Sequence, residues 1–124
     1  MVGIGAMSSY GMAFMAPRFI PQKKPTLAFV EHCVNDSGCP HEGLVAKGIE
    51  GVVRQLRALD SDPDIVLLRA PSRPGGEVNE KIEAALAVHR QVAEHYGATV
   101  ISVHDYVHRV LAERGQCWGD VGID

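Results

Sequence analysis

The chain has 124 residues, 46% apolar and 22% charged, which is typical of a single soluble globular domain. A formal charge of −3 at pH 7 and an aromatic content of 6% argue against nucleic-acid binding, which needs a basic surface or a stacking platform. The three cysteines are an odd number, so no disulfide framework is expected.

The N-terminal part of the chain predicts little regular structure before one buried strand. Residues 1–20 lack the basic start of a secretory signal, and glycines and serines break up their apolar character, so neither a signal peptide nor a membrane span is expected and the compartment is left open. A short helix is expected around residues 9–18. The apolar run 26–31 predicts a buried strand, and residues 35–42 predict a loop.

The rest of the chain alternates between helical and strand patterns. Apolar residues recur at steps of three and four in the first helical segment, and short continuous apolar runs indicate buried strands. The expected order is helix 44–59, strand 64–69, helix 77–96, strand 98–103 and helix 105–114. This alternation is typical of an α/β domain with a parallel sheet.

Asn35 and Asp36 directly follow the first predicted strand. Ligands of open parallel sheets bind outside the carboxyl ends of the strands. An Asn at that position can direct its side-chain NH₂ at a developing negative oxygen, as in an oxyanion hole. We expect Asn35 in this role and Asp36 as a partner that fixes the loop. The alternative is that both side chains bond their own backbone in a turn.

Three segments of the chain resemble the SGNH (GDSL-like) hydrolases. They are Gly3-Ile-Gly-Ala-Met-Ser-Ser9, the stretch from Lys24 to Asp36 that ends in Val-Asn-Asp, and Val92-Ala-Glu-His-Tyr-Gly97. The resemblance implies a flavodoxin-like three-layer α/β/α sandwich with a parallel sheet. It also implies the activity of an esterase, lipase or carbohydrate acetylesterase. Because three strands are few for such a sheet, we expect residues 1–124 to be a single, partial domain of this type.

The resemblance also assigns roles to individual residues. Asn35 matches the Asn that donates to the oxyanion. Gly5 matches the Gly whose backbone N–H is the second donor, with Gly3 and Ala6 as alternatives. The family's Gly-Asp-Ser nucleophile motif does not occur in this sequence. Asp124 matches the Asp of the C-terminal Asp-x-x-His, whose His would lie three residues beyond it.

Other groupings of residues offer weaker candidates for chemistry. Asp105-Tyr-Val-His108 has the Asp-x-x-His spacing, but Asp105 is expected to begin a helix as its cap or first-turn carboxylate. Ser8 and Ser9 lack the flanking sequence of an activated nucleophile. Zinc ligation is an alternative for a group of Cys and His whose spacing does not match known structural sites, namely His32, Cys33, Cys39 and His41.

Two arginines and a histidine lie outside these groups. Arg69 and Arg73 are expected to be solvated, with contact to a substrate carboxylate as the alternative. His89 is expected to lie on the surface of its helix or to pack there.

Two functions are compatible with this pattern. The first is an esterase domain that hydrolyses a small-molecule or carbohydrate ester by acyl transfer, without a cofactor or metal. As given, the chain would be inactive because the nucleophile and base are missing. The second is a non-catalytic binding module on the same fold. With strands missing, we also expect self-association through an exposed sheet edge.

Overall fold

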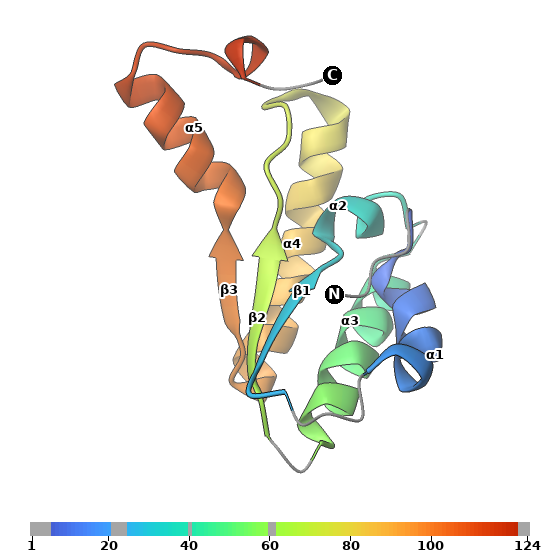
Figure 1. The fold of residues 1–124 in the computed structure, drawn as a ribbon. Helices are drawn as coiled ribbons and strands as arrows, with labels where there is room; N and C mark the ends of the chain where they lie inside the picture. Colours follow the sequence, from blue (N-terminus) through green and yellow to red (C-terminus); the bar gives the residue numbers. More distant parts are fainter. Residues whose placement is uncertain (1–5, 21–24, 40, 60–61, 122–124) are drawn as a thin grey trace.

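A parallel sheet with helices packed against it forms the framework of the chain (Figure 1). The structure is a computed structural model that describes residues 6–20, 25–39, 41–59 and 62–121. Its elements are α1 (Ser9–Phe19), β1 (Leu27–Glu31), α2 (Cys33–Asp36), α3 (Glu42–Arg57), β2 (Asp64–Arg69), α4 (Gly76–Tyr96), β3 (Thr99–Ser102), α5 (Val103–Glu113) and the 3₁₀ helix η1 (Trp118–Asp120). Among the described helices, none has the length and apolar character needed to cross a membrane.

The three strands lie in the order β1-β2-β3 and are all parallel, which confirms the α/β class predicted from the sequence. Val30 pairs with Leu67, and Leu67 pairs with Val100, so these side chains form one row on the same face of the sheet. This face packs against α3 and α4, and Val30 and Leu67 belong to the main hydrophobic core. The sheet therefore provides one buried face and directs its carboxyl ends toward α2 and α5 (Figure 1).

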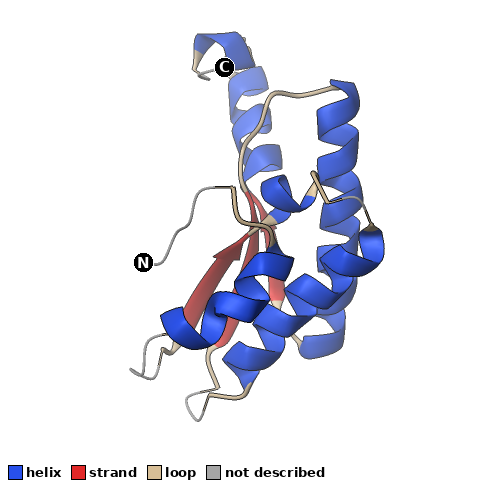
Figure 2. Cartoon of the chain, turned by 90° about the vertical axis from the view of Figure 1, so that its right-hand side faces the viewer, coloured by secondary structure: helices blue, strands red, loops and turns tan. Residues whose placement is uncertain are grey.

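The opposite face of the sheet carries exposed apolar side chains. Phe29 is 63% exposed, Leu27 is 49% exposed and Ile101 is 44% exposed. Both views of the molecule place α3 and α4 on one side of the sheet (Figures 1 and 2). The second helical layer of the expected sandwich is therefore not among the residues that the structure describes.

Two glycines of α3 allow α1 to approach closely. A Cβ atom on Gly48 would lie 2.4 Å from the backbone nitrogen of Tyr10 and 2.5 Å from the Ser9 hydroxyl. A Cβ on Gly51 would lie 2.9 Å from the Ala13 Cβ. The helix propensity lost at these glycines is offset by this contact, which fixes where α1 begins.

Two local features differ from the sequence prediction. The segment after β1 forms the short helix α2, because Asp36 donates its N–H to the His32 carbonyl at 2.8 Å instead of continuing as a loop. Helix α5 begins before Asp105, and its cap is Ser102, whose hydroxyl accepts the Asp105 N–H at 3.2 Å. Asp105 lies in the first turn of α5, which is the other position expected for its carboxylate.

Replacement of Gly48 by alanine tests the contact between α1 and α3. We expect Gly48→Ala to lower the free energy of unfolding by about 1–3 kcal/mol, because the new methyl group meets backbone atoms of Tyr10. Gly43→Ala in the same helix has open space around its Cβ and should be neutral or stabilising by up to about 1 kcal/mol. Urea unfolding of both variants measures the difference. Equal stability of the two would show that α1 does not pack in this way.

Candidate active site

Asn35 lies on α2, just beyond the carboxyl end of β1, and lines a cavity of about 610 Å³. Its side chain is half-buried and makes no hydrogen bond to any described residue. In the alternative interpretation, the Asn35 side chain would bond its own backbone in a turn. The turn is instead closed by the backbone, because the Asn35 carbonyl accepts the Gly38 N–H at 3.3 Å. The NH₂ group of Asn35 is therefore available to a ligand in the cavity.

The segment that leads into α1 lines the same cavity. Ala6, Ser8 and Tyr10 line it together with Asn35. Ala6 has a φ of 56°, a left-handed backbone conformation that is uncommon for a residue with a side chain. Of the candidates for the second oxyanion donor, Ala6 is thus on the cavity wall, whereas Gly3 and Gly5 lie outside the described residues, as does Asp124.

Asp36 faces away from the cavity and is 2% exposed. One carboxylate oxygen, Oδ1, accepts the backbone N–H of Ser9 at 2.7 Å, and Oδ2 accepts a hydrogen bond from Nε2 of His89 at 2.7 Å. These bonds connect α2 to the first residue of α1 and to the middle of α4. They confirm the expectation that Asp36 fixes the chain around Asn35.

The serines near the cavity do not have the surroundings of an activated nucleophile. Ser9 is fully buried, and its hydroxyl has no hydrogen-bond partner among the described residues. It contacts Asp36 only through its backbone N–H, so Ser9, Asp36 and His89 do not form a catalytic triad. The Ser8 hydroxyl serves as the N-cap of α1 and accepts the Gly11 N–H at 3.5 Å.

Two of the four candidate zinc ligands, His32 and Cys33, bond to other groups. His32, the N-cap residue of α2, donates from Nδ1 to the Met7 carbonyl at 3.0 Å, a second bond between the α2 region and the segment that leads into α1. Cys33 is buried, and its thiol donates to the Ile82 carbonyl. Burial, followed by the nearby charge of Glu31, raises the pKa of this thiol to about 12, so Cys33 is not a thiolate nucleophile at neutral pH.

A second cavity, of about 420 Å³, lies between α3 and α4. The segment Ser37–Cys39 lines both this cavity and the one that contains Asn35. Val45 and Val88 provide apolar lining in the second cavity. The segment Ser37–Cys39 therefore separates the two cavities.

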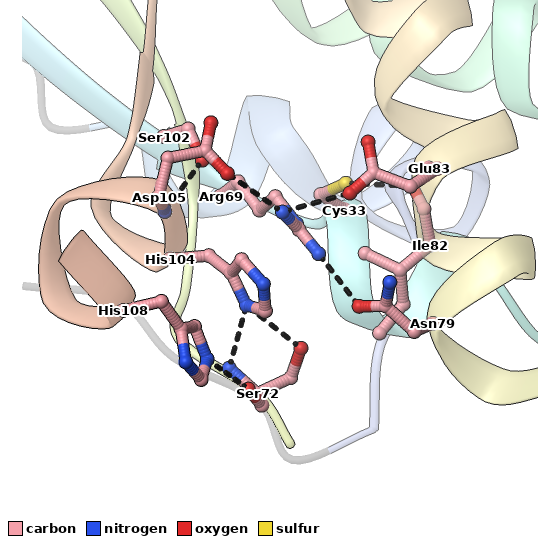
Figure 3. A network of polar contacts seen from close by, with 10 residues as sticks. All are labelled: Cys33, Arg69, Ser72, Asn79, Ile82, Glu83, Ser102, His104, Asp105 and His108. Atoms are coloured by element: carbon pink, nitrogen blue, oxygen red, sulfur yellow. Dashed lines mark hydrogen bonds and ion pairs between the residues drawn. The ribbon is translucent and has the colours of Figure 1, made fainter. Parts of the chain in front are cut away.

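Arg69 lies at the carboxyl end of β2 and is fully buried, so the expectation that it is solvated was wrong (Figure 3). Its guanidinium lies 2.8 Å from Glu83 of α4 and 3.4 Å from Asp105 of α5, and it donates to Asn79 at 2.8 Å. Two carboxylates and an amide compensate the desolvated charge. Arg69 is therefore a connection between β2, α4 and α5 and is not exposed for substrate binding.

The Asp105-Tyr-Val-His108 segment also has a structural role (Figure 3). Its carboxylate contacts Arg69, and His108 donates from Nε2 to the Ser72 carbonyl at 2.9 Å. Nδ1 of His104 accepts the Ser72 N–H at 3.2 Å and lies 3.2 Å from the Ser72 hydroxyl. These contacts attach α5 to the segment that follows β2.

Sequence reasoning missed two partners in these networks. His89 was expected on the surface or in packing, and it does pack, with 1% exposure, but its bond to Asp36 was not predicted. The available signal was a His on the apolar side of an amphipathic helix together with a carboxylate beyond a buried strand. Ser72 gave no such signal, because its contacts depend on how α5 sits against β2.

The attachment of α5 should depend on pH through His104. Burial, then the positive charges of Arg69 and His108, lowers the pKa of His104, whereas Asp105 and Glu83 oppose this shift. The detached helix binds the proton more tightly, so the contribution of His104 is complete above its ordinary pKa of about 6.5 and is lost as pH falls below it. We expect amide protection of α5 to decrease below about pH 6.5.

Hydrogen exchange and the fluorescence of Trp118, whose ring lies 5.4 Å from that of His108, measure this change. In His104→Gln the side chain cannot titrate, and the same decrease should be strongly reduced. An unchanged pH dependence in this variant would show that another group controls α5.

The comparison with protein families agrees with the arrangement of sheet and helices. The model of the GDSL-like Lipase/Acylhydrolase family matches residues 2–123. No match to the chain was found among curated proteins or among solved structures. Because the match covers almost the whole sequence, this chain belongs to the GDSL-like lipase/acylhydrolase family.

Proposed function

We propose that this chain is the oxyanion-binding part of an esterase domain that hydrolyses esters by acyl transfer. The observation that carries the proposal is the position of Asn35. Its carboxamide has no hydrogen-bond partner among the described residues and lines a cavity at the carboxyl end of a parallel strand. Membership of an acylhydrolase family supports the same chemistry. A tetrahedral intermediate in the cavity would place its negative oxygen against the Asn35 NH₂ group.

The second donor in this proposal is a backbone N–H at the start of the chain. Gly5 remains the proposed residue, with Ala6 as the alternative that the cavity wall supports. The left-handed conformation of Ala6 turns the backbone at this point and changes the direction of the neighbouring peptide N–H groups. Two donors from different segments would then converge on one oxygen.

We propose that the nucleophile and base come from sequence outside residues 1–124. A Gly-Asp-Ser segment before Met1 would supply the serine, and a His three positions beyond Asp124 would supply the base. The free edge of β1 supports this arrangement, since β1 pairs only with β2 among the described strands. A parallel strand added there, about 4.8 Å from β1, would end close to Asn35.

The exposed Leu27 and Phe29 on β1 are apolar surface that such an added segment would cover. In the isolated chain, the same edge is where we propose self-association. The substrate class is a small-molecule or carbohydrate ester, and the chemistry needs no cofactor.

The second candidate function is a non-catalytic binding module on the same fold. The burial of Ser9 and the absence of a Gly-Asp-Ser motif from the sequence favour it. The two candidate functions make different predictions about the flanking coding sequence. The esterase requires that it encode the serine and the histidine, whereas the binding module does not.

Labelling with a fluorophosphonate probe separates the two functions. We expect no labelling of residues 1–124 alone and labelling of a protein that includes the natural flanking sequence on both sides. In the labelled protein, Asn35→Ala should lower kcat by about 10²–10³-fold, because one oxyanion donor is lost. Steady-state hydrolysis of an aryl acetate measures this effect.

Gln91→Ala, on the exposed side of α4, is the control and should leave kcat unchanged. If the extended protein is not labelled, the binding module is the better account. If it is labelled but Asn35→Ala retains full kcat, an esterase remains and the role of Asn35 is wrong.

A further inference from the structure

We propose that Asp36 is the positioning residue of the oxyanion site and that His89 holds it in place; this inference rests on the proposed role of Asn35. Neighbouring residues on a helix point in directions about 100° apart. The single turn of α2 can therefore present Asn35 to the cavity while Asp36 points into the protein interior.

The carboxylate of Asp36 connects the two segments that line the cavity, α2 and the start of α1. It belongs to α2, which carries Asn35, and it accepts the N–H of Ser9, which follows the wall residue Ser8. The Ser9 N–H is the first of α1 and has no partner within the helix. Loss of Asp36 would thus release α1 from α2 at the point where the two donor segments meet.

His89 fixes the direction of this carboxylate. The side chains of Asp36 and His89 are each 1% exposed, so neither group can exchange its partner for water without movement of the helices. With His89 donating to Oδ2, the other oxygen is directed at Ser9. Removal of the donor at position 89 leaves a buried carboxylate with one unsatisfied oxygen, which favours rotation of Asp36 away from this geometry.

An oxyanion site stabilises charge only when its donors are placed precisely. Donors stabilise a developing charge only when they are already aimed at it, and displacement by about 1 Å can reduce the effect 100-fold. Disruption of the Asp36–His89 bond should therefore weaken anion binding at Asn35 even when the fold is retained.

Methylphosphonate, a tetrahedral oxyanion, is a direct probe of this site. In the isotope-labelled chain, titration should shift the side-chain NH₂ signals of Asn35 in ¹⁵N–¹H spectra. We expect His89→Leu to raise the dissociation constant at least tenfold, because the donor to Asp36 is lost. His89→Gln, which keeps a side-chain N–H donor, should restore binding to within about threefold of the original.

Tyr96→Phe is the matched control. Tyr96 also lies on α4 and donates to Glu50 of α3 at 2.7 Å, the same distance as in the His89–Asp36 bond. A merely structural role for His89 predicts that both variants, where they fold, bind methylphosphonate as the unmodified chain does. Positioning predicts that only His89→Leu weakens binding. If His89→Leu does not fold, Asp36→Asn, which keeps the side-chain volume, takes its place with the same expected loss.

The possible failures are distinguishable. If methylphosphonate leaves the Asn35 signals of the unmodified chain unchanged, the proposed oxyanion role of Asn35 is wrong, and the positioning role is overturned with it. If the unmodified chain binds and His89→Leu binds equally well, the role of Asn35 stands and only the positioning role of Asp36 and His89 is overturned.

Discussion

One buried carboxylate, that of Asp36, holds together the helices that surround the cavity. It satisfies the otherwise unpaired first N–H of α1 and accepts a hydrogen bond from His89 on α4. A buried polar pair adds little net stability, but leaving one member unpaired costs about 1–3 kcal/mol. Its main effect is therefore to select one arrangement of α1, α2 and α4, and this arrangement gives Asn35 its place on the cavity wall.

Close packing and polar contacts together fix the positions of the other elements. The core between α3 and the sheet fixes β1, while the absence of side chains at Gly48 and Gly51 brings α1 within reach of Asp36. Beyond the carboxyl end of β2, the contacts of Arg69 and Ser72 attach α5 to the sheet. The two networks lie beyond different strands, so we expect the attachment of α5 to depend on His104 and the Asn35 cavity to depend on Asp36.

Much of the fold could be predicted because apolar spacing is a local property of the sequence. The runs before Asn35 and Arg69, and the helical spacing from Leu44 to Leu59, gave the order of strands and helices. The pairing of Asp36 with His89 and the burial of Arg69 depend on residues far apart in the chain, so apolar spacing alone does not predict them. Ser102 was missed as a cap because a β-strand residue directly before a helix serves both elements.

Hydrogen exchange at the backbone amide of Ser9 tests the central role of Asp36 most directly. The first N–H groups of a helix normally exchange quickly, since they lack partners within the helix. A bond to buried Asp36 predicts that the Ser9 amide is protected as strongly as amides in the middle of α3. Exchange of the Ser9 amide at the rate of an unfolded chain, while α3 remains protected, would contradict this account.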